Sequence, residues 1–194
     1  YGEEVVGAQL RILDENEKVI EEWTSEKEPH VVSLDAGSYT LVETIAPHGY
    51  QVATSISFTV DAKGKVTVNG VEQNGQIIMT DDVAKVSISK VGEKGNTVAE
   101  LPGASMKLTY TGDGTLEQVT AKNAVDANKF KAGKTEITWT SGAEALILEK
   151  IPNGSYTLEE NEAPEGYELA TKITFEVKDG VVGNVIIDED SKST

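Results

Sequence analysis

Gly154-Ser155-Tyr156-Thr157-Leu158 repeats an earlier stretch of the same chain, Gly37-Ser38-Tyr39-Thr40-Leu41, at an offset of 117 residues. Two further matches keep this offset: Ala163-Pro164-Glu165-Gly166-Tyr167 with Ala46-Pro47-His48-Gly49-Tyr50, and Ile173-Thr174-Phe175-Glu176-Val177 with Ile56-Ser57-Phe58-Thr59-Val60. An ordered series of matches at one spacing indicates a duplication. Two copies of this length predict tandem domains, because a solenoid needs more and shorter repeats.

The offset shrinks toward the start of the second copy. Trp139-Thr140-Ser141 matches Trp23-Thr24-Ser25 at 116 residues, and Pro102-Gly103-Ala104 matches Val6-Gly7-Ala8 at only 96. The second copy therefore contains an insert, placed at about 111–138, in which residues 123–131 could form a short helix. We expect a first domain over 1–83 and a second over 84–194.

Apolar and polar residues alternate with a period of two inside each copy. Ile56, Phe58 and Val60 alternate with Ser57 and Thr59, and 86–89 and 173–177 repeat the pattern. This is typical of antiparallel strands with one face on a core and one in water. Turn sequences such as Asn69-Gly70 separate the strands. Together they predict an all-β fold of two tandem Ig-like antiparallel β-sandwiches.

Composition narrows the classes of function. The 194 residues have a net charge of −16 and no cysteine. The negative charge disfavours nucleic acid and anionic membranes as partners, and no apolar run is long enough to span a bilayer. Without cysteine there is no disulfide, zinc–thiolate site or cysteine nucleophile. His30 and His48 stand alone, so we expect no metal and no cofactor.

Three ionisable residues of the second copy share a phase with apolar neighbours. Lys90 is in phase with Val86 and Ile88, Glu160 with Leu158, and Asp188 with Ile186. This pattern fits a buried ion-paired triad or a solvated lysine at a strand end. It also fits a reactive set, because burial disfavours the charged forms of amines and carboxylic acids. A neutral amine could then attack a carboxylic acid while a second carboxyl moves the protons.

Four motifs in the second copy occur in the order of a known family. They are Lys90-Val91-Gly92, Leu101-Pro102-Gly103-Ala104, residues 154–160 and residues 163–167. The chain resembles the B-type domain of collagen-binding adhesins, also called the prealbumin-like or SpaA-type pilin domain, over nearly its whole length except the insert. The first copy is similar to the fibronectin-binding-protein domain used for protein ligation, on runs that include Thr40–Thr44 and Lys65–Gly70.

The resemblance implies a spontaneous isopeptide bond between the first and last strands of a domain. In the second copy it implies Lys90 as nucleophile, Asp188 as acceptor and Glu160 as proton shuttle. Asp190, one pleat further on, is a second acceptor candidate. Such a bond would supply the covalent staple that a chain without cysteine lacks.

The first copy departs from this pattern. Glu43 matches Glu160, and Asp81 matches an acceptor, but Tyr1–Ala8 begin after the point where the lysine strand is expected. Its lysines lie near turns or on exposed strand positions: Lys18, Lys27, Lys63 and Lys65. Either the sequence is cut before that strand or another chain supplies it. We therefore expect no intramolecular isopeptide bond in this copy, and an open sheet edge to which another chain could donate a strand.

Three functions follow from these features. The first is a structural stalk or pilin-like module of a Gram-positive surface adhesin, extracellular, anchored to the cell wall outside this stretch and partnered by neighbouring surface-protein domains. The alternative is direct binding of a host or matrix protein, most plausibly through the insert with Phe130. An enzyme, for example a glycosidase using Glu43 and Asp81, is disfavoured because the carboxylates are phased into a core.

Overall fold

The computed structural model describes residues 3–188, which form two compact units. Unit one comprises residues 3–47 and 51–82, and unit two comprises 48–50 and 83–188. The predicted all-β fold is confirmed, since the one helical element of the described chain is the 3-10 turn η1 (Asp126–Asn128). The division lies one residue before the predicted boundary, except that the turn 48–50 of the first copy belongs to unit two.

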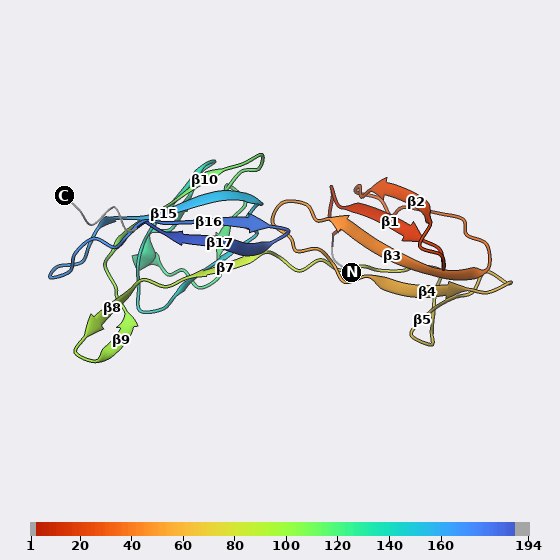
Figure 1. Cartoon of the computed structure of the whole chain (residues 1–194), viewed down its shortest axis with the longest axis horizontal. Coiled ribbons are helices and arrows are strands. Elements are labelled where there is room, and N and C mark those ends of the chain that lie inside the picture. The colour runs from red at the N-terminus through yellow and green to blue at the C-terminus, as the bar shows by residue number, and fades with distance from the viewer. Residues whose placement is uncertain (1–2, 189–194) are drawn as a thin grey trace. The chain divides into compact units, whose positions relative to one another are not determined.

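Unit one is built on one antiparallel sheet with the strand order β2-β1-β3-β4-β5-β6 (Figure 1). Its strands are β1 (Gln9–Leu13), β2 (Val19–Thr24), β3 (Gly37–Ile45), β4 (Ile56–Val60), β5 (Val66–Val68) and β6 (Val71–Gln73). On β4, Phe58 and Val60 are buried while Ser57 and Thr59 are exposed, as the alternation predicts. One face of the sheet therefore carries the core.

Extended segments without ladder pairing cover that face. Val32 and Leu34 of the crossover after β2, and Ile77 and Met79 of the segment after β6, pack against the buried cluster of β1, β3 and β4. Accessibility alternates along 77–81, with Ile77, Met79 and Asp81 half-buried and the residues between them exposed. This segment runs like a strand, which places Asp81 on the core side.

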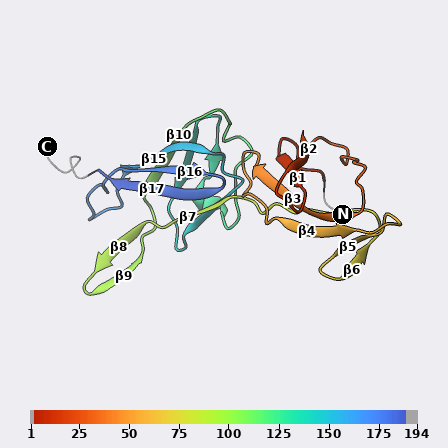
Figure 2. The same cartoon turned by 45° about the vertical axis from the view of Figure 1, so that its right-hand side comes forward.

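Unit two is a sandwich of a six-stranded and a three-stranded antiparallel sheet, with a separate hairpin (Figures 1 and 2). The large sheet contains β12 (Lys131–Ala132), β13 (Glu136–Thr140), β10 (Ser105–Thr111), β15 (Gly154–Glu162), β16 (Ile173–Lys178) and β17 (Val181–Ile187), in that order. The small sheet contains β11 (Thr120–Ala121), β14 (Leu146–Glu149) and β7 (Lys85–Ile88), and the hairpin pairs β8 (Val91–Lys94) with β9 (Thr97–Glu100).

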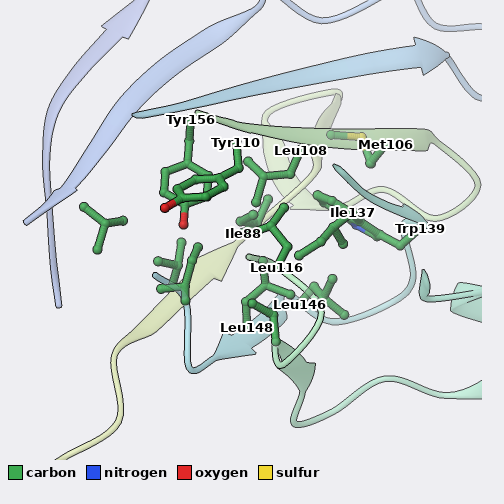
Figure 3. Close-up of a cluster of buried hydrophobic side chains, with 14 of the residues drawn as sticks. Ile88, Met106, Leu108, Tyr110, Leu116, Ile137, Trp139, Leu146, Leu148 and Tyr156 are labelled. Atoms are coloured by element: carbon green, nitrogen blue, oxygen red, sulfur yellow. The ribbon is translucent and has the colours of Figure 1, made fainter. Parts of the chain in front are cut away.

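The core of unit two fills the space between these sheets (Figure 3). Leu108 and Ile137 of the large sheet and Leu148 of the small sheet are fully buried. Tyr156 stacks on Phe175 with ring centroids 5.1 Å apart. Trp139, the repeat partner of Trp23, is 4% exposed, as expected for a residue of the core.

The insert is part of this core. Leu116 and Val119 are 0% and 3% exposed, and Phe130 is half-buried against the same cluster. Within the insert, Val125 is exposed at 65%. The predicted short helix is limited to η1. Val119 thus fills the sandwich, and Phe130, expected to contribute to a binding surface, packs with part of its side chain against the core.

Hydrogen bonds explain why Gly-Ser-Tyr recurs. The Tyr39 hydroxyl donates to the carbonyl of Asp35 at 2.8 Å, and the Tyr156 hydroxyl donates to the carbonyl of Pro152 at 2.5 Å. In each copy the phenol thus fixes the turn four residues before it. Burial, with the nearby Tyr110 as a smaller cause, raises the pKa of Tyr156 well above its usual range. Tyr156 therefore remains a neutral hydrogen-bond donor.

A serine clamp accounts for the repeated Trp-Thr-Ser. Ser141 Oγ accepts the N–H of Ala104 at 2.9 Å and donates to the carbonyl of Leu101 at 2.6 Å. Ser25 Oγ makes the same two bonds, with the N–H of Ala8 and the carbonyl of Val5, at 2.9 and 2.6 Å. Each serine joins the end of one strand to the loop that enters the neighbouring strand.

Ser141→Ala should therefore lower the free energy of unfolding of unit two by about 1–3 kcal/mol, because the buried N–H of Ala104 loses its acceptor. Urea denaturation would measure the change. Ser155→Ala, at an exposed position on β15, is the matched control and should change stability by less than about 0.5 kcal/mol. Equal stabilities of the two variants would refute the clamp.

Candidate functional site

The lysine singled out by the sequence lies beside the predicted proton shuttle. Lys90 follows β7, on which Val86 and Ile88 are buried, and its side chain is only 12% exposed. Its Nζ lies 3.7 Å from Oε1 of Glu160, whose side chain is fully buried. Both side chains face the interior of unit two, in agreement with the alternation along their strands.

Glu160 is held by one of its two oxygens. Oε2 accepts the backbone N–H of Ala170 at 2.5 Å. Oε1, the oxygen nearest the amine, is buried and accepts no hydrogen bond from the described residues. Lys90 Nζ also lies 3.4 Å from the carbonyl of Val91. Glu160 is thus oriented through one oxygen and has the other available to take a proton from Nζ.

Unit one repeats this orientation. Glu43 is 3% exposed, and its Oε2 accepts the backbone N–H of Ala53 at 2.5 Å. Ala53 and Ala170 are the positioning residues that reasoning from the sequence missed. The signal was present, since Ala53-Thr54 and Ala170-Thr171 also match at 117 residues. A main-chain donor, however, leaves no side-chain signature.

Asp188, the predicted acceptor, is at the surface. It follows the edge strand β17, all of whose residues are exposed, and its own N–H donates to the carbonyl of Lys172 at 2.9 Å. Ile186, two residues before it, is 62% exposed. The prediction that Ile186 and Asp188 face the core is therefore wrong, because β17 has no covering layer in the described chain. Asp190 lies outside the described residues.

The acidic pair of unit one is assembled, in contrast. The side chain of Glu43 lies close enough to Asp81 to lower the pKa of that carboxyl. Burial raises the pKa of Asp81 above its ordinary value; the interaction with Glu43 lowers it, and the charge of Asp82 raises it further. All four lysines of this unit are exposed.

Unit two thus pairs an amine with a carboxylate, and unit one pairs two carboxyl groups at the equivalent glutamate. The chain matches the family model of the SpaA prealbumin-like fold domain over residues 1–74 and 84–191. It belongs to this family. SpaA-type domains are structural modules and not enzymes, which agrees with the function expected from the sequence.

Several solved structures are similar to this pair of SpaA-type domains. The Bacillus anthracis TIE protein is 28% identical with a TM-score of 0.43, over 90% of this chain and 28% of that one. The pilus adhesin SpaC of Lactobacillus rhamnosus GG is 17% identical with a TM-score of 0.33, over 94% of this chain and 25% of that one. The chain thus spans about a quarter of the length of both proteins.

The shaft pilin SpaA of Lactobacillus rhamnosus GG, solved as its D295N mutant, is 17% identical with a TM-score of 0.30, over 89% of this chain and 81% of that one. No curated protein sequence matches the chain.

Neither SpaA-type domain shows a metal site or a membrane-spanning helix in its described residues. No group of three or more histidine or acidic side chains between residues 3 and 188 could hold a metal ion. No helix of this part of the chain is long and apolar enough to cross a bilayer.

Asp81→Asn should stabilise unit one at neutral pH. Because its pKa is raised in the folded state, Asp81 contributes stability below the unfolded pKa of about 3.9, and this contribution is lost as pH rises through the folded pKa. The asparagine cannot ionise, so the free energy of unfolding should fall less steeply above pH 4 in the variant than in the native chain. The gain at pH 7 should stay below about 1 kcal/mol, since Asp81 is half-buried.

Chemical denaturation of the Asp81→Asn variant between pH 4 and 7 would measure this effect. Asp82→Asn should reduce the slope only in part, because it removes one of the causes that raise the pKa of Asp81 and leaves Asp81 ionisable. An unchanged slope of stability against pH in the Asp81 variant would contradict the argument.

Proposed function

We propose that this chain is a stalk segment of a Gram-positive cell-surface adhesin or pilus, fastened in unit two by an isopeptide bond from Lys90. The observation that carries the proposal is the Lys90–Glu160 pair at 3.7 Å inside the core of a SpaA-type domain. A buried ion pair gives up much of its Coulomb energy to desolvation. Conversion to a neutral amide removes that cost and ties the first strand to the last.

The reaction needs three groups. Lys90 passes a proton to Glu160 Oε1, and its Nζ lone pair attacks the carboxyl carbon of the acceptor, for which we propose Asp188. The new C–N bond replaces a C–O bond. Glu160 passes the first proton to an oxygen of the acceptor carboxylate, takes the second proton from Nζ after the attack and passes it to the same oxygen, which leaves as water, so that Glu160 ends as a carboxylate again. Asp188 is exposed on the surface, so its side chain must turn from the end of β17 toward Nζ for the bond to form.

An intact mass spectrum tests this proposal. One amide formed with an aspartate lowers the mass of the 20.8 kDa chain by one water, about 18 Da. Proteolysis followed by mass spectrometry should recover Lys90 joined to a carboxyl-terminal peptide, and Asp188→Ala and Asp190→Ala separate the two acceptors. A mass equal to that of the unmodified sequence would refute the cross-link.

We propose a second role for unit one, as the acceptor of a strand that carries a lysine. Two observations favour it: Glu43 is buried and the interacting Asp81 is half-buried on the core side, and the second layer of the unit is made of segments without ladder pairing. An added strand would gain backbone hydrogen bonds and apolar contacts. Its lysine could then form an amide with Asp81, with Glu43 as the proton shuttle.

A synthetic peptide with the sequence of residues 84–91, the lysine-bearing opening strand of the second copy, is a suitable probe. Incubation with the chain should give an adduct whose mass is the sum of the two minus one water. A peptide with Lys90→Arg, or a chain with Asp81→Ala, should give none. An adduct that persists with Asp81→Ala, or no adduct with the native pair, would exclude this role.

The structure disfavours the alternative of direct binding through the insert. Leu116 and Val119 of the insert are buried in the sandwich and Phe130 is half-buried against it. Leu116 and Val119 therefore offer no apolar surface to a host protein, and Val125 is the exposed apolar side chain of the insert.

A further inference from the structure

The turn with the sequence Ala-Pro-x-Gly-Tyr occurs once in each copy, in two different environments. In the first copy Ala46 is 2% exposed and Gly49 is buried. In the second copy Ala163 is half-buried, Gly166 is exposed and Tyr167 is 39% exposed. The same local sequence is thus covered in one place and open in the other.

Backbone contacts cover the first turn. Residues 48–50 belong to unit two, in which the carbonyl of Gly49 accepts the N–H of Ala84 at 2.8 Å and Tyr50 forms a β-bridge with Val83. A Cβ on Gly49 would lie 3.1 Å from the carbonyl oxygen of Lys150. Such close approach requires glycine. Recognition of this turn therefore depends on main-chain shape and not on particular side chains.

The second turn has the same backbone form without these contacts. The φ of Gly166 is 86° and that of Gly49 is 90°. The N–H of Tyr167 donates to the carbonyl of Pro164 at 3.1 Å, which closes the turn. A Cβ on Gly166 would meet nothing within 4 Å, and Leu169, three residues on, is 56% exposed. The turn is therefore preformed, and Leu169 is exposed beside it, while one edge of the Tyr167 ring lies against Gly92 of β8.

We infer that the turn Ala163–Tyr167 is a docking surface for a further SpaA-type domain. The opening segment of that domain would donate a backbone N–H to the Gly166 carbonyl, as Ala84 does to Gly49. The partner is of the same class because unit two already binds this turn motif through the backbone of Val83, Ala84 and Lys150. The inference rests on the proposed stalk function, in which such domains follow one another.

Hydrogen exchange followed by mass spectrometry tests the inference. The 194-residue chain is compared with a longer chain in which residues 84–194 are repeated after Thr194 through a short Gly-Ser linker. Exchange of the amides of residues 166–169 should slow by about tenfold or more in the longer chain, since local opening then requires undocking. The amides of residues 49–51 are the internal reference and should be protected in both chains.

Gly166→Asn provides the matched variant. Asparagine tolerates positive φ, so the turn should keep its form, while the added side chain occupies the space that the docked backbone needs. In the longer chain this variant should return the exchange of residues 167–169 to the rate in the short chain. Gly180→Asn, in the β16–β17 turn with φ 75°, should leave the protection intact.

Three outcomes would overturn the inference. The first is equal exchange of residues 166–169 in both chains, and the second is fast exchange of residues 49–51. The third is protection that rises with the concentration of the 194-residue chain alone, which would assign the turn to self-association. The intact masses of the same samples report the Lys90 cross-link separately, so a failure of docking and a failure of the cross-link are distinguishable.

Discussion

Lys90→Ala is expected to abolish the loss of one water from the mass and to destabilise unit two strongly. A covalent link between Lys90 and Asp188 closes a loop of about 100 residues, for which the chain-entropy treatment of cross-links gives about 4.7 kcal/mol. For a domain of this size, such a loss lowers the melting temperature by roughly 20 °C. Differential scanning calorimetry, with a mass spectrum of the same sample, would measure both effects.

Lys85→Ala is the matched control on the same strand. Lys85 is exposed and pairs with Glu149 at 3.7 Å on the surface, so its removal should cost at most about 1 kcal/mol. Glu160→Gln should also prevent the bond, because the amide cannot accept the proton of the amine. The assigned roles are wrong if Lys90→Ala has the melting temperature of the native chain. They are also wrong if the mass of Glu160→Gln is still one water below that of its sequence.

Leu116→Ala should destabilise unit two by about 2–5 kcal/mol, because it leaves a cavity in a packed core. Leu116 belongs to the insert and has no counterpart in the first copy, yet it is fully buried between the two sheets. Denaturation in urea would measure the loss. A loss of this size would show that the insert is a structural part of the sandwich.

Val125→Ala tests the opposite role within the same insert. Val125 is 65% exposed, so the substitution should change stability by less than about 0.5 kcal/mol. If Leu116→Ala were neutral for stability while Val125→Ala lowered it, the insert would not be anchored in the core through Leu116.

Much of the candidate site could be predicted because alternation along a strand is local. Lys90 shares its phase with Val86 and Ile88, and both its direction and its glutamate neighbour follow from that phase. The same argument failed for Asp188. Asp188 and Ile186 are two residues apart and so share a side of the extended chain, but β17 lies at a sheet edge without a covering layer and has no buried face.

The sequence by itself determined the duplication, the all-β class, the family and the inward direction of Lys90 and Glu160, because each depends on the order of residues close together in the chain. Only the tertiary structure decided that the insert fills the core, that Asp188 is exposed, that Asp81 lies near Glu43 and that one of the two Ala-Pro-x-Gly-Tyr turns is covered. These depend on which distant segments pack together, and the period-two pattern contains no information about that.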